Sequence, residues 1–109
     1  MAFMIIATTE TIPGQKIDAY VGVVWATVVR SRHLGHDLYA MLKSIKGGDI
    51  RSYESLTDNA RADVLKKLEA NAKAQGANGV VGMRLGTTAV MPGMVEVFAY
   101  GTAVKLKKA

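Results

Sequence analysis

The two histidines of this 109-residue chain, His33 and His36, are the side chains best suited to hold a metal ion. On a helix their i, i+3 spacing places both imidazoles on one face, and Asp37 adds a carboxylate nearby. Asp37 points about 100° away from His36 around such a helix, and a zinc site needs three or four protein ligands. Within one chain we therefore expect exposed or helix-capping histidines. A metal site formed by His33 and His36 across the subunits of an oligomer is the alternative.

A second group of candidate residues combines arginine with tyrosine near the ends of apolar segments. Arg30, Tyr20 and Tyr100 are its central members. A guanidinium and phenol hydroxyls can bind a polar small molecule or an anion at a subunit interface. Structural hydrogen bonding at strand ends is the more ordinary role, and the sequence leaves both interpretations open.

The residue types of the chain do not indicate a catalytic site. The chain has no cysteine, and a serine nucleophile would need His33 or His36 as its base. Nothing around either histidine indicates that role. We therefore expect a protein that is not an enzyme, and we assign neither a catalytic residue nor a cofactor.

The composition describes one folded domain over residues 1–109. Half of the residues are hydrophobic, which excludes a disordered tail, and the lack of cysteine excludes a disulfide-stapled scaffold. With 14 Lys+Arg against 9 Asp+Glu the net charge is +5. The basic residues are scattered, and the only short run is Lys105, Lys107 and Lys108. This scatter argues against nucleic acid as a partner, and weak binding to nucleic acid stays open as an alternative.

The longest apolar run, residues 21–29, is far shorter than the ~20 residues of a membrane-spanning helix. The N-terminal residues have no basic stretch before their short apolar segment, so they do not resemble a signal peptide. We expect a cytoplasmic protein with no membrane partner.

Four apolar segments have the length and β-branched content of strands, and two others repeat apolar residues at helical spacing. The strands are expected at residues 3–9, 16–29, 78–89 and 95–107, and the first helix at about 35–46. The second helix follows a cap at Asp49 or Ser52, repeats apolar residues every four positions from Leu56 to Ala72, and ends before Gly76. Residues 91–94 are expected to form the turn before the last strand, whose one face is expected to hold Val95, Val97, Ala99, Gly101 and Ala103. The order β-β-α-α-β-β predicts an α+β domain with a mainly antiparallel four-stranded sheet and helices on one face.

The second expected strand is apolar on both faces, from Tyr20 to Val29. Two helices on one side of a sheet cover only one of those faces. The other face is therefore expected to meet another copy of the chain, so we predict a homo-oligomer.

The chain as a whole resembles the YbjQ-like family, a group of small bacterial and archaeal proteins labelled heavy-metal-binding. Five segments carry the resemblance in the same order along nearly all of the chain. They are Thr8-Thr9 with the turn at 11–14, residues 20–24, residues 45–48 with 51–54, residues 74–82, and residues 101–104. The resemblance implies an α+β subunit that assembles into a ring, a pentamer. It also implies metal binding, but it supplies no ligand residues for this chain.

Overall fold

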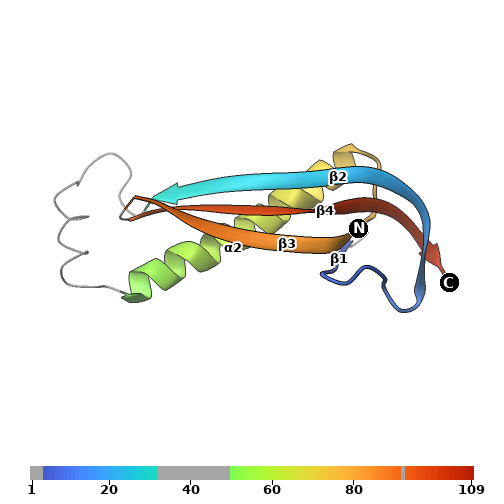
Figure 1. Ribbon diagram of the computed structural model, residues 1–109, viewed down its shortest axis with the longest axis horizontal. Helices are drawn as coiled ribbons and strands as arrows, with labels where there is room; N and C mark the ends of the chain where they lie inside the picture. Colours follow the sequence, from blue (N-terminus) through green and yellow to red (C-terminus); the bar gives the residue numbers. More distant parts are fainter. Residues whose placement is uncertain (1–3, 32–49, 92) are drawn as a thin grey trace.

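The computed structural model describes residues 4–31, 50–91 and 93–109 (Figure 1). The predicted helix at 35–46 and the two histidines lie outside these residues. The described elements are β1 (Ile5–Ile6), β2 (Gln15–Ser31), α2 (Ile50–Ala74), β3 (Gly79–Met91) and β4 (Met94–Lys108). They form a mixed α+β domain with one four-stranded sheet, as the sequence predicted, and the sheet is curled.

The sheet has the strand order β1-β3-β4-β2. Strand β4 lies in the middle, antiparallel to β3 on one side and to β2 on the other. The predicted turn between the last two strands is confirmed, and its Gly93 has φ 80°, a conformation that favours glycine. The N-terminal strand is shorter than predicted and runs parallel to β3. Past it the chain still bonds to β3, because the Ala7 amide donates to the Val80 carbonyl at 2.8 Å.

Helix α2 lies against one face of the sheet, mainly on β2 and β4 (Figure 1). Its apolar residues at every fourth position, Ala60, Val64, Leu68 and Ala72, are fully buried. This is the stripe that an amphipathic helix needs in order to bind a core. The helix ends as predicted, since Gly76 has φ 86° and the Ala77 amide donates to the Ala72 carbonyl.

The sheet face under α2, the inner face, completes the core. Its members are small or β-branched residues that alternate along the strands and are almost without solvent exposure: Val24, Ala26, Val28, Val80, Val95, Val97, Ala99 and Ala103. The predicted alternation of the last strand is confirmed, because its odd-numbered residues from Val95 to Ala103 are the buried ones.

Two irregularities curl the sheet near the start of β2. The register against β4 shifts between Ile17 and Ala19 and again between Tyr20 and Gly22. Such bulges bend a strand and increase its twist. Figure 1 shows the result, because β2 and β4 bend together towards the C-terminus.

None of the helices among the described residues is long and apolar enough to span a lipid bilayer.

The core predicts a clear cost for shortening Leu68, which is fully buried at the middle of the helix stripe. Leu68→Ala should lower the free energy of unfolding by about 2 to 5 kcal/mol, because the lost contacts leave a cavity. Urea unfolding at several protein concentrations measures the change. The half-buried Leu65 gives the control, since Leu65→Ala should cost less. Equal costs for the two variants would contradict this description of the core.

Candidate functional site

The sheet face opposite α2, the outer face, carries a row of exposed apolar side chains. On β2 these are Val23, Trp25 and Val29, which are 63%, 65% and 50% exposed. They alternate with the buried residues of the inner face, so they point away from α2. Tyr20, 71% exposed, and Tyr100, 46% exposed, belong to the same face. The sequence prediction that one face of this strand is left without cover within the chain is confirmed for the described residues.

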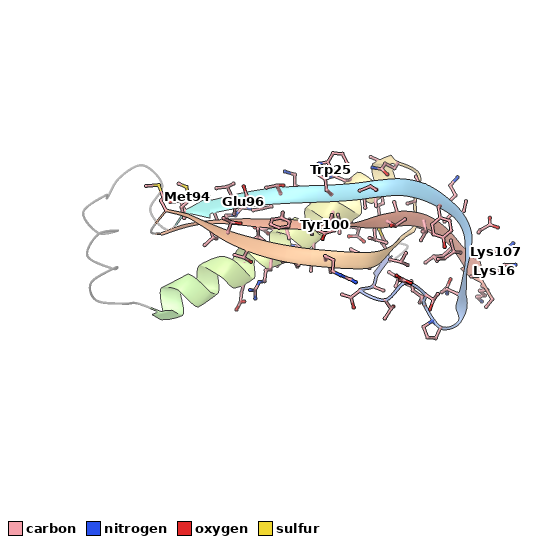
Figure 2. All side chains as sticks on the ribbon, in the orientation of Figure 1. Lys16, Trp25, Met94, Glu96, Tyr100 and Lys107 are labelled. Atoms are coloured by element: carbon pink, nitrogen blue, oxygen red, sulfur yellow. The ribbon has the colours of Figure 1, made fainter. Side chains whose placement is uncertain are left out.

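Aromatic rings organise the middle of the outer face (Figure 2). Trp25 on β2 lies directly opposite Tyr100 on β4. The Tyr100 ring stacks on Phe98 with centroids 6.4 Å apart and planes 12° from parallel. Phe98 in turn lies over Gly86 of β3, where a side-chain carbon would overlap the ring. Glycine at position 86 therefore lets an aromatic ring of the neighbouring strand cover β3.

An arginine borders this aromatic group. Arg84 lies opposite Tyr100 in the β3–β4 register, and its guanidinium donates to the carbonyls of Thr8 and Met83, each at 3.0 Å. The outer face thus presents indole and phenol rings, and an exposed arginine follows on β3 with its guanidinium held on the side of the N-terminal segment.

Of the three predicted ligand-binding residues, two lie on the same face of the sheet, but they are far apart along it. Tyr20 and Tyr100 share the outer face, but Tyr20 pairs with Val104, four residues from Tyr100 along β4. Four residues of a strand span about 13 Å. Arg30 lies on the inner side, where its Nη2 is 2.6 Å from Oδ2 of Asp63 on α2. Within one chain Arg30, Tyr20 and Tyr100 therefore do not line one pocket.

The free edge of β2 is held by side chains of α2. Lys67 Nζ donates to the Thr27 carbonyl at 2.9 Å, and Asn71 Nδ2 donates to the Trp25 carbonyl at 2.8 Å. These contacts occupy acceptors that another strand would otherwise use. An open cavity of about 350 Å³ lies beside them, lined by Trp25, Asn71, Ala74 and Gln75. The α2 side chains thus occupy two backbone acceptors of this edge, and the outer face offers the exposed side chains of β2.

The described part of the chain does not form a metal site by itself. There, no group of three or more histidine, cysteine, aspartate or glutamate side chains is close enough to hold an ion. The predicted metal ligands His33 and His36 lie outside the described residues.

Sequence reasoning missed several residues that shape this region. The sequence contained a signal for Lys67 and Asn71, because polar residues four positions apart lie on the same face of a helix. No sequence pattern predicted the roles of Arg84 and Gly86, because these roles depend on the register between β3 and β4.

The Arg30–Asp63 pair should behave as a structural ion pair. Both side chains are partly exposed, at 45% and 39%. A double-mutant cycle with Arg30→Gln and Asp63→Asn should therefore give a coupling of about 0.2 to 1 kcal/mol at low salt, decreasing as salt is added. The longer Arg61–Asp58 pair, at 3.8 Å, serves as the control with weaker coupling. No coupling between Arg30 and Asp63 would show that Arg30 is free for another role.

Comparisons with known proteins agree with this fold. A family model described as "Putative heavy-metal-binding" matches residues 4–107. A "UPF0145 protein" of Colwellia psychrerythraea is 50% identical over 105 residues, covering 96% of this chain and 100% of that protein. Another, of Psychromonas ingrahamii, is 51% identical with the same coverage. A solved structure of a Pediococcus pentosaceus protein of unknown function from the DUF74 family shares the fold, with TM-score 0.57, 23% identity, and 95% and 98% of the two chains covered. The chain belongs to the YbjQ-like family.

Proposed function

We propose that this chain acts in the cytoplasm as a non-catalytic homo-oligomer whose subunits meet through the outer face of the sheet. A ring of five subunits is the arrangement that the family resemblance implies. The observation that carries the proposal is the exposure of Val23, Trp25 and Val29, each at least half exposed, on an otherwise well-packed sheet. Contiguous apolar surface of this kind marks interaction sites on folded domains.

A second copy of the chain suits this face better than an unrelated small molecule. Val23, Trp25 and Val29 lie along a single strand and form an extended surface, and of the three Trp25 also borders the open cavity at the strand edge. Burial of such surface stabilises an assembly by about 25 cal/mol per Å² of apolar area. The neighbouring edge of β2 is occupied by Lys67 and Asn71, which directs association to the face.

We further propose that a polar small molecule or an ion binds where subunits meet. Tyr20 and Tyr100 offer exposed hydroxyls on the outer face, and Arg84 lies opposite Tyr100 on β3 with its guanidinium directed to the Thr8 carbonyl. Arg30 belongs to such a site only as a residue donated by a neighbouring subunit, because its own chain directs it towards α2.

The double variant Val23→Glu and Trp25→Glu should dissociate the oligomer without unfolding the subunit, because both side chains lie outside the core. Native mass spectrometry at matched concentrations gives the subunit number. The same spectra give the mass of any small molecule or ion that the wild-type oligomer retains. Leu85→Glu is the matched control, since Leu85 is 36% exposed but alternates onto the inner face. A wild-type monomer, or dissociation by the control alone, would overturn the proposal.

Metal binding through His33 and His36 across subunits is the second candidate, favoured by the description of the matching family. It requires the assembly, because the described residues contribute no ligand cluster of their own. Protein from cells grown with added zinc, copper and nickel should then retain metal in proportion to subunits. The double variant His33→Ala and His36→Ala should lose it, measured by elemental analysis. Metal-free wild-type protein from the same growth would eliminate this candidate.

A further inference from the structure

Beyond the start of β3, strands β2 and β4 continue as a two-stranded ribbon. Strand β3 begins at Gly79, opposite Val104, so residues 105–108 of β4 pair only with residues 15–19 of β2. We call these two segments the terminal ribbon. Figure 2 shows its labelled residues Lys16 and Lys107 at the end of the molecule near the C-terminus.

The terminal ribbon concentrates positive charge. It carries four lysines, Lys16, Lys105, Lys107 and Lys108, and a single acidic side chain, Asp18. Lys16 lies directly opposite Lys107, and Lys105 shares the face of Lys107 because it is two residues away. Like charges in this cross-strand arrangement repel each other, so an anion that binds between them relieves the repulsion.

Internal ion pairing does little to neutralise this charge. Asp18 Oδ1 is 3.2 Å from Lys107 Nζ, but both side chains are more than half exposed, so the pair is weak. Lys16, Lys105 and Lys108 form no ion pair with the described residues.

The backbone under the lysines is held in place. The Asn78 side chain donates to the Leu106 carbonyl at 3.0 Å and accepts from the Leu106 amide at 2.6 Å, in the manner of a neighbouring strand. Leu106 itself lies against Gly79, where a side-chain carbon would meet it. Ile17 pairs with Leu106, and both are half-buried on the face opposite Lys105 and Lys107. The ribbon thus half-buries Ile17 and Leu106 on one side and presents Lys16, Lys105 and Lys107 to solvent on the other.

We propose that the terminal ribbon binds a linear chain of phosphate groups, with Lys16, Lys105 and Lys107, which share one face, contacting successive phosphates. Lysine ammonium groups bind phosphate as point charges, and such contacts read no base sequence. A two-stranded ribbon is also narrow enough to enter the DNA major groove. A lipid surface fits less well, because the apolar residues of the ribbon, Ile17 and Leu106, are not exposed for insertion.

This inference goes beyond the proposed function and does not depend on it. The sequence prediction against nucleic acid rested on basic residues scattered along the chain. Strand pairing adds Lys16, which is far away in sequence, to the C-terminal lysine run.

Binding of the full-length protein to a fluorescent DNA duplex, measured by anisotropy between about 50 and 200 mM salt, tests the proposal. Three phosphate contacts predict a slope of log K against log salt of about −2.7, from 0.9 per contact. The variant Lys16→Gln with Lys107→Gln should reduce the slope to about −0.9 and weaken binding about 60-fold at 0.1 M salt. The control Arg61→Gln with Lys66→Gln removes the same charge from α2 and should change affinity less than about twofold.

Competition separates the sources of the phosphate chain. Displacement of the duplex by inorganic polyphosphate supports recognition of phosphate chains in general, whereas displacement by DNA alone supports a nucleic acid ligand. Native mass spectra of both variants must show the wild-type subunit number, which keeps this result independent of assembly. No binding to either polymer at 50 mM salt, or an equal loss in both double variants, would overturn the proposal. Binding only to vesicles with anionic phosphatidylserine would overturn it as well, in favour of a lipid surface.

Discussion

The packing of α2 onto one face of the sheet is the interaction on which the rest of the described structure depends. The Ala60–Val64–Leu68–Ala72 stripe meets small and β-branched residues of β2 and β4, and together they form the core. A strand that is buried by this helix on one side has nothing from its own chain on the other side, within the residues described. The exposure of Val23 and Trp25 follows directly from that one-sided cover.

The same helix also limits how the sheet can grow. By donating from Lys67 and Asn71 to carbonyls of β2, α2 closes part of an edge that would otherwise invite another strand. Beyond the end of the helix, β2 and β4 continue as the basic terminal ribbon without α2 against them. One packing arrangement therefore separates the chain into an apolar face, a closed edge and a charged end.

Short-range patterns were sufficient to predict most of this fold. The four-residue repeat from Ala60 to Ala72 predicted the helix, and Gly76 and Gly93 marked its end and the final turn because both adopt positive φ. The alternation along β4 predicted its inner and outer residues. The continuous apolar character of β2 predicted a face without cover, which the exposure of Trp25 confirms.

Long-range geometry could not be predicted in the same way. The separation of Arg30 from Tyr20 depends on strand alternation and on a bulge at Gly22, whose position only the pairing with β4 reveals. The juxtaposition of Lys16 and Lys107 depends on the register of two strands that are distant in sequence. The composition identified the tyrosine, arginine and lysine residue types, but it could not show which of these residues lie close together in the fold.

Burial of Trp25 tests the central claim, that the outer face is an interface, most directly. Trp25 is the only tryptophan of the chain and is 65% exposed in the single subunit, so the indole fluorescence comes from this part of β2 alone. In the assembled protein we expect blue-shifted emission that iodide quenches poorly, with a shift to the red and efficient quenching on dilution into monomers. Red-shifted emission that iodide quenches efficiently at every protein concentration would contradict the account.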